Sequence, residues 1–212
     1  MNEQRWTLDP DINDYLSGMV PPKDIIERLI VEREPIEAAA PKVGDRAPDF
    51  EAERMSEDGE RTGKFVNLSE FHGQPVALLF GSYTCPVYRG QIARFNEIYD
   101  ELKDQYAFLT IYTREAHPED GWQVEINHSQ GVTYHQPKTV DERAKIARVC
   151  ITRHGIRMPI ALDTMNDDIE KLYSGSPERL YVIDADGIVA YRSGRGPFMM
   201  SMIEEWYAAL KN

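Results

Sequence analysis

One stretch of this sequence, residues 76–88 (VALLFGSYTCPVY), constrains the fold more than any other. It begins as an uninterrupted apolar run, which predicts a buried strand, and Gly81 ends that run. From Pro86 onward, apolar side chains recur at helical spacing for about five turns. A strand, a tight turn and a helix therefore follow one another, and Cys85 lies where the helix begins.

Cys85 is predicted to be a reactive thiol because of this position. The start of a helix offers unpaired N–H groups and a partial positive charge, which lower the pKa of a thiol placed there. The hydroxyl of Ser82 or Thr84 can cap the helix, and those of Tyr83 and Thr84 can hydrogen-bond the thiolate. The alternative is that Cys85 is a buried, unreactive side chain, which is the usual state of a free cysteine.

The composition limits the compartment and the partners. The length of 212 residues suits one domain with an appendage, and the net charge of −12 argues against nucleic acid or an anionic membrane surface as a partner. Only two cysteines occur, so no disulfide framework is expected. Residues 1–14 are polar and acidic, unlike a signal peptide, and no apolar run approaches the ~20 residues of a membrane span. We therefore expect a cytoplasmic protein.

The order of the predicted elements indicates an α/β fold with a mixed central sheet and helices on both faces. The elements around the Cys85 helix are a short strand and one helical turn at 66–73, a strand at 107–113, a helix at 139–153, a strand at 159–163, a helix at 167–173, a hairpin around 186–187 and a closing helix at 199–210. A strand, a helix and a second strand in sequence predict a right-handed parallel unit. The Asp-Gly pair between two apolar runs is a strong hairpin signal.

Two regions lie outside this minimal pattern. Residues 1–40 are predicted to form an N-terminal helical extension, with a polar arm up to residue 21 and then a short amphipathic helix that Pro35 interrupts. Residues 41–212 form the main domain. Within it, residues 114–138 are a long loop rich in histidine, glycine, tryptophan and proline. Compact domains seldom keep such a loop without a functional reason.

A cysteine at the start of the first helix is the thioredoxin-like placement. In that fold a proline just before the hairpin, usually in the cis form, faces the thiol. Pro177 occupies this place, and Pro159 is the weaker candidate; an ordinary trans loop proline is the alternative. Tyr88 stands where such sites have their second cysteine, so no local disulfide can form and an external thiol must regenerate Cys85.

Two segments resemble signature motifs of the iodothyronine deiodinase family. Residues 80–88 (FGSYTCPVY) are similar to its active-site motif, in which selenocysteine usually stands where this chain has Cys85. Residues 111–122 (IYTREAHPEDGW) resemble its second signature, which generic thioredoxin relatives do not carry. Further matches follow in order at 163–165, 177–183 and 194–197. The resemblance covers about residues 76–197, whereas residues 44–50 (GDRAPDF) resemble the start of peroxiredoxin and redoxin domains.

The chain also departs from the family pattern. A thiol is a poorer nucleophile and leaving group than a selenol. The family has cysteines at the positions of Tyr83 and near Met158, so resolving-thiol roles have no residue here. A second family histidine falls near Pro137, two residues from His135. The family's membrane anchor has no counterpart in this sequence, and we therefore expect a soluble, microbial relative.

Four residues beyond the Cys85 turn are candidates for the chemistry. His117 follows a predicted strand end at the sheet edge where the Cys85 helix starts, so its imidazole can bind a phenolate or donate a proton. Glu115 can orient His117 or relay protons. Trp122 can stack on an aromatic substrate or pack the core. Arg195, between two glycines, can clamp a substrate carboxylate. The alternatives are a surface histidine, a solvated carboxylate and a flexible surface arginine.

No metal and no tightly bound cofactor is expected. His128 and His135 are spaced too loosely with Glu125 for a metal site. The second cysteine, Cys150, is expected to be structural and buried on a helix face.

The resemblance implies a thiol-dependent reductive dehalogenase. The Cys85 thiolate would attack a halogen of a halogenated phenol or thyronine, and His117 would bind the phenol or supply a proton. An external reductant, either a small thiol or a thioredoxin-like protein, would then restore the enzyme. The first alternative is a peroxiredoxin-like peroxidase, in which a peroxide oxidises Cys85 to sulfenic acid. The second is a non-enzymatic redox sensor or ligand-binding protein. The resemblance and the helix at 23–40 also predict a homodimer.

Overall fold

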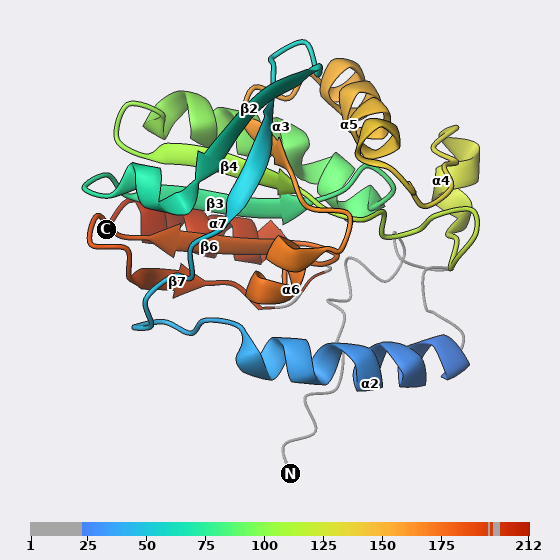
Figure 1. Cartoon of the computed structure of the whole chain (residues 1–212), viewed down its shortest axis with the longest axis horizontal. Helices are drawn as coiled ribbons and strands as arrows, with labels where there is room; N and C mark the ends of the chain where they lie inside the picture. The colour runs from blue at the N-terminus through green and yellow to red at the C-terminus, as the bar shows by residue number, and fades with distance from the viewer. Residues whose placement is uncertain (1–22, 195, 197–199) are drawn as a thin grey trace.

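The computed structural model describes residues 23–194, 196 and 200–212, and a mixed sheet organises this part of the chain (Figure 1). Its seven strands are β1 (Glu51–Met55), β2 (Arg61–Asn67), β3 (Val76–Gly81), β4 (Ala107–Tyr112), β5 (Ile160–Leu162), β6 (Arg179–Ile183) and β7 (Val189–Arg192). They lie in the order β2-β1-β5-β4-β3-β6-β7. β4 is parallel to both β3 and β5, whereas β6 is antiparallel to β3. The predicted mixed sheet is confirmed.

Helices cover both faces of this sheet. The described helices are α2 (Lys23–Ala39), α3 (Pro86–Leu102), α4 (Glu125–Ser129), α5 (Val140–His154), α6 (Asp168–Tyr173) and α7 (Met200–Leu210), with a 3-10 turn η1 (Leu68–Phe71). Successive side chains of a strand point to opposite faces, so β3 divides the core in two. Ala77 and Leu79 pack with buried side chains of α3, α5 and α7, whereas Leu78 and Phe80 pack with those of α6.

The central strand β3 determines where the chemically active residues meet. β3 leads directly into the Cys85 turn, and its parallel neighbour β4 ends beside it at Tyr112. The antiparallel strand β6 begins at the same edge, with Arg179 opposite Phe80. Three segments therefore meet where β3 and β4 end and β6 begins. They are the Cys85 turn (residues 82–85), the 114–138 loop and a segment that we call the Pro177 loop (residues 174–178).

The predictions for the second half of the domain are confirmed. α5 and α6 begin within a residue of their predicted starts, and the Asp186–Gly187 turn joins the antiparallel strands β6 and β7. The Ser176–Pro177 peptide bond is cis, as predicted. It is the one cis bond in the described ranges, so the weaker candidate, Pro159, is trans.

Three features differ from the predictions. Pro35 does not interrupt the N-terminal helix, and α2 runs through it because Arg33 and Glu37 on either side bind the domain. Residues 51–67 form the β1–β2 hairpin at the sheet edge, of which only the end of β2 was predicted. The 114–138 loop contains the short helix α4.

Two predicted features, the polar arm at 1–21 and Arg195, lie outside the described residues. None of the helices that the structure describes combines the length and the hydrophobicity needed to cross a membrane.

Candidate active site

Cys85 is the N-cap residue of α3, in the turn that follows β3. Pro86 is the first residue of the helix, as predicted. The predicted capping role of Ser82 or Thr84 is wrong, because neither is the N-cap residue, and the Cys85 side chain itself makes no capping hydrogen bond. The backbone N–H of Cys85 instead donates to the Ser82 carbonyl at 3.2 Å, which closes the turn.

The hydroxyls of the turn bind the 114–138 loop. Ser82 Oγ accepts a hydrogen bond from the Ala116 N–H at 3.2 Å. Thr84 Oγ1 accepts one from the His117 N–H at 3.0 Å. Both hydroxyls are fully buried, so water does not compete for these contacts. The turn that carries the thiol and the loop that carries the histidine are therefore fastened together.

Glu115 strengthens the same junction from inside the protein. Its Oε2 accepts the Thr84 N–H at 2.8 Å, and its Oε1 accepts the Tyr112 hydroxyl at 2.5 Å. The Tyr112 oxygen in turn accepts the Tyr83 N–H at 3.0 Å. Burial raises the pKa of Glu115, and the hydrogen bonds from Tyr112 and Thr84 oppose that rise. These contacts let Glu115 orient His117 through the backbone and hydroxyl of Thr84.

The imidazole of His117 is neutral near pH 7 because it is buried. Its side chain is almost fully buried, and burial lowers its pKa to about 4. Nδ1 lies 3.3 Å from the Trp122 carbonyl oxygen. A carbonyl oxygen only accepts, so Nδ1 carries the hydrogen and Nε2 is left as an acceptor. The Trp122 ring packs edge-on against the imidazole, with centroids 4.3 Å apart. The Trp122 carbonyl thus favours the tautomer whose Nε2 can accept a hydrogen bond.

The predicted lowering of the Cys85 pKa is wrong for the site as it stands. Only 2% of Cys85 is exposed, and burial raises the pKa of its thiol well above the ordinary value. The Glu178 carboxylate raises it further. The N–H groups of Tyr88 and Val87 and the Arg89 guanidinium act in the opposite direction, but they do not outweigh burial. Burial therefore favours the neutral thiol over the thiolate at this site.

Glu178 was not singled out from the sequence, although it follows Pro177 directly. Its side chain is completely buried. The pairing of Arg179 with Phe80 brings Glu178 to the end of β3, beside the Cys85 turn. The backbone of Gly196 lies close against it, because a Cβ at that glycine would be 3.2 Å from the Glu178 Cβ. A buried carboxylate thus forms part of the thiol environment.

Arg89 is a second residue that the sequence reasoning missed. It lies one helical turn after Cys85 and is 6% exposed. Its Nη1 donates to the Tyr83 carbonyl at 2.5 Å, and its Nη2 donates to Asn127 Oδ1 and Gln130 Oε1, both at 2.8 Å. The same guanidinium therefore holds the Cys85 turn and the end of the loop helix α4. The sequence did offer one signal for Arg89, namely a positively charged residue one helical turn after the cysteine.

Hydrogen bonds and a ring contact join four predicted site residues, namely Thr84, Glu115, His117 and Trp122, and Cys85 follows Thr84 directly in the chain. The side chain of Tyr83 is fully buried, and its hydroxyl accepts a hydrogen bond from Arg153 Nη1 at 3.1 Å while its ring packs against that of Tyr134. Tyr83 thus reaches the site through its backbone. The roles proposed for these side chains in catalysis and substrate binding remain predictions.

The two remaining residues of redox interest are inaccessible. Tyr88, at the resolving position, is fully buried, and its ring lies where a Cβ on Gly81 would come within 2.5 Å of it. Cys150 is a free, fully buried thiol on α5, and burial raises its pKa far above the ordinary value. In the described ranges, no group of three or more His, Cys, Asp or Glu side chains is arranged to hold a metal ion.

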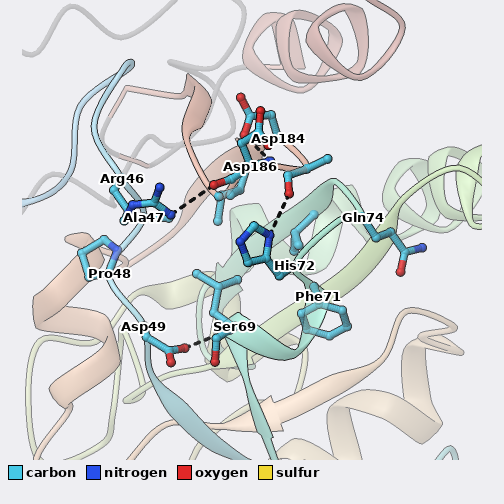
Figure 2. A pocket seen from close by; sticks show the side chains of 15 residues that line it. Arg46, Ala47, Pro48, Asp49, Ser69, Phe71, His72, Gln74, Asp184 and Asp186 are labelled. Carbon is cyan, nitrogen blue, oxygen red and sulfur yellow. Dashed lines mark hydrogen bonds between the residues drawn. The ribbon is translucent and has the colours of Figure 1, made fainter.

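A hollow of about 460 Å³ lies at the opposite end of these strands, where β3 begins and β6 ends (Figure 2). His72 Nδ1 lies 3.2 Å from the Ala185 carbonyl oxygen, and Arg46 Nη1 donates to the Asp186 carbonyl at 3.1 Å. These polar groups of the hollow bind neighbouring backbone, and the hollow is separate from the Cys85 site.

The sequence matches one family of known proteins, both as a family model and as individual relatives. Residues 35–211 match the family model of iodothyronine deiodinase. The thyroxine 5-deiodinase of Rattus norvegicus is 30% identical over 165 residues, which are 77% of this chain and 52% of that protein. The enzyme of the same name from Gallus gallus is 31% identical over 77% of this chain and 61% of its own length. The chain thus spans about half the length of the rat relative.

Solved structures show the fold alone. The thioredoxin domain of a thiol-disulfide oxidoreductase from Bacteroides vulgatus superposes with a TM-score of 0.52 at 17% identity, covering 78% of this chain and 98% of that one. A peroxidoxin from Mycobacterium tuberculosis gives 0.54 at 18% identity, covering 81% and 97%. The predicted thioredoxin-like fold is confirmed.

Proposed function

The chain belongs to the iodothyronine deiodinase family, and on this premise we propose that it is a thiol-dependent reductive deiodinase with Cys85 as its nucleophile. The hydrogen bond from the His117 N–H to Thr84 Oγ1, at 3.0 Å, is the observation that carries this proposal. It binds the loop with the second family signature to the turn with the first. Peroxide reduction has no need of such a loop.

The proposed substrates are iodinated phenols of the thyronine type, since the relatives are named for thyroxine. Nε2 of the neutral His117 accepts the phenol O–H. The Trp122 ring, packed against the imidazole, forms an aromatic wall beside it. Because the imidazole has a pKa of about 4, it binds the phenol and not the phenolate near neutral pH.

The proposed reaction has three steps. Cys85 sulfur forms a bond to iodine as the carbon–iodine bond breaks, and the hydrogen of the thiol ends on the ring carbon. An external thiol then attacks the sulfenyl iodide sulfur, which releases iodide and a proton and leaves a mixed disulfide. A second external thiol frees Cys85 and leaves as the oxidised disulfide. The substrate carbon is reduced and two thiols are oxidised.

The proposal is tested by iodide release from an iodinated phenol and from an iodothyronine, with dithiothreitol as the reductant. Hydrogen peroxide consumption is measured with the same preparation. Cys85→Ser should abolish iodide release, whereas Cys150→Ser, the matched control, should retain it. Peroxide consumption that depends on Cys85, without iodide release, would replace the deiodinase proposal with the peroxidase alternative. Light scattering tests the predicted homodimer separately.

A further inference from the structure

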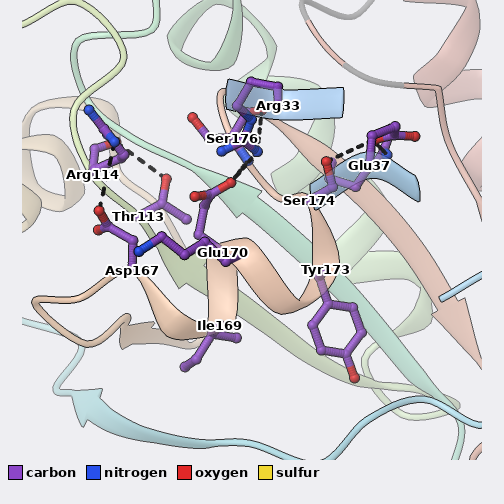
Figure 3. A network of polar contacts seen from close by, with 12 residues as sticks. Arg33, Glu37, Thr113, Arg114, Asp167, Ile169, Glu170, Tyr173, Ser174 and Ser176 are labelled. Atoms are coloured by element: carbon purple, nitrogen blue, oxygen red, sulfur yellow. Dashed lines mark hydrogen bonds and ion pairs between the residues drawn. The ribbon is translucent and has the colours of Figure 1, made fainter. Parts of the chain in front are cut away.

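The N-terminal helix α2 lies along the domain and packs against α6 (Figure 1). Figure 3 shows the polar contacts that join them. Arg33 forms an ion pair with Glu170, whose side chain is completely buried. Arg33 Nη2 also donates to the Ser176 carbonyl at 3.4 Å, and Glu170 Oε1 accepts the Ser176 N–H at 3.1 Å. Both backbone groups of Ser176, in the Pro177 loop, are therefore held by this one ion pair.

A second anchor lies one helical turn further along α2. Glu37 pairs with Arg179, which is completely buried at the start of β6, and with Arg192 at 2.5 Å. Its Oε2 also accepts the Ser174 hydroxyl at 2.7 Å. Burial raises the pKa of Glu37, but the hydrogen bonds from Arg179 and Ser174 and the two arginine charges outweigh burial and keep it ionised. Side chains of α2 thus bind the chain on both sides of Pro177.

The segment between these anchors lies against the end of β3, and its Glu178 acts electrostatically on the thiol. Gly175 lies directly on the Phe80 ring, since a Cβ there would be 2.3 Å from it. Glu178 is buried beside the Cys85 turn, because Arg179 pairs with Phe80 near the end of β3. The Pro177 loop therefore covers the end of the strand from which the Cys85 turn departs.

We propose that Arg33 and Glu37 are positioning residues, which act through Glu170, Ser176 and Arg179 to hold the Pro177 loop closed over Cys85. Glu170 and Arg179 are charges without access to water, and α2 supplies an opposite charge to each. Removal of either α2 partner leaves a buried charge uncompensated. Moving the loop outward hydrates that charge, and the same movement exposes the sulfur. The inference concerns access to the thiol and holds whichever substrate Cys85 attacks.

The test measures how fast iodoacetamide modifies Cys85 and Cys150 in the native protein, each followed by mass spectrometry. Cys150 reports on opening of the whole core. It is fully buried on α5, which does not belong to the Pro177 loop, so movement of that loop alone should not expose it. The variants are Arg33→Ala, Arg33→Lys and Glu37→Gln. Glu34→Gln, at an exposed position of the same helix, is the matched control.

We expect Arg33→Ala to increase the modification rate of Cys85 about tenfold, with the rate of Cys150 unchanged. Arg33→Lys should give a smaller increase, because it keeps the charge for Glu170 but not the planar donor group. Glu37→Gln should increase the Cys85 rate as well, and Glu34→Gln should match the wild type. If Arg33→Ala does not fold, the two milder variants decide the question. Unchanged Cys85 rates in the folded variants would overturn the proposal, as would equal increases for both cysteines.

Discussion

The backbone N–H of His117 donates to Thr84 Oγ1 at 3.0 Å, so the residue that precedes the nucleophile positions the histidine of the loop. Thr84 also donates its own N–H to Glu115 and accepts a hydrogen bond from Asn127 through its carbonyl. One residue thus ties together the turn, the buried carboxylate and the loop helix. The backbone that carries the thiol cannot shift without moving its proposed partner.

This relationship predicts that Thr84→Val damages catalysis, whereas Thr84→Ser does not. Valine keeps the shape but leaves the His117 N–H without an acceptor in a buried site, which costs about 1–3 kcal/mol. The loop should shift to recover that loss, and misplacement of His117 should lower kcat/KM by about 10- to 100-fold. The kcat/KM values of the two variants and the wild type are measured by steady-state iodide release. Equal activity of the valine and serine variants would show that the hydroxyl is not needed.

Arg89→Ala should destabilise the protein more than a typical surface substitution. The buried guanidinium donates hydrogen bonds to Tyr83, Asn127 and Gln130, and a hydrogen bond to a charged group contributes about 1.5–3 kcal/mol. We expect a loss of at least ~3 kcal/mol in the free energy of unfolding, measured by urea denaturation. Arg94→Ala is the control on the same helix, since Arg94 pairs with Glu204 at the surface and should cost under ~1 kcal/mol. Similar losses for both variants would contradict the role of Arg89.

His117 should make the protein less stable as the pH falls. Its pKa is about 4 in the folded protein against 6.5 for the free side chain. Between these values the unfolded chain binds a proton that the folded chain does not, so the free energy of unfolding decreases with falling pH. From about pH 7 to about pH 4.5 the wild type should lose about 2 kcal/mol more than His117→Gln.

The comparison with the variant isolates this contribution. Burial raises the pKa of Asp163 to about 6, so this carboxyl takes up its proton more readily in the folded state and acts in the opposite direction. Asp163 is present in both proteins, and its effect cancels in the difference. Parallel pH profiles for the wild type and His117→Gln would show that the imidazole is not held neutral by burial.

Glu178→Gln should make Cys85 easier to ionise. The carboxylate raises the pKa of the thiol, and glutamine keeps its shape without the charge. The pH profile of Cys85 alkylation should therefore move to lower pH in the variant, while that of Cys150 should not move. In the wild type, the rate should still be rising at about pH 8.5, the ordinary pKa of a thiol. A wild-type plateau near neutral pH would contradict the raised pKa.

The sequence predicted those parts of the fold in which burial follows a regular pattern. The apolar run of β3 and the helical spacing in α3 are such patterns, and both elements lie where they were expected. β2 was largely missed because most of its residues are exposed, so its sequence lacks the alternation of a half-buried strand. Pro35 was misjudged because the ion pairs of Arg33 and Glu37 with distant residues override a local helix-breaking preference.

The candidate site shows the same division. The strand–turn–helix pattern identified Cys85, and the position after a strand end together with the motif resemblance identified His117. No local pattern shows that Arg89 and Glu178 are buried, because their partners come from other segments of the chain. The pKa of Cys85 was misjudged for a related reason. The helix start is a local feature that favours the thiolate, whereas the burial that outweighs it is produced by the whole tertiary structure.

The central claim, that Cys85 attacks iodine, is tested most directly by a single turnover without reductant. The protein is mixed with an iodinated phenol, released iodide is measured against the amount of protein, and Cys85 is probed with dimedone, which traps the sulfenic acid formed when water hydrolyses the sulfenyl iodide. The account predicts iodide equimolar with the chain and dimedone on Cys85, both absent in Cys85→Ser and both retained in Cys150→Ser. Iodide release that persists in Cys85→Ser would contradict this account. So would a wild-type protein that releases no iodide although its Cys85 reacts with iodoacetamide.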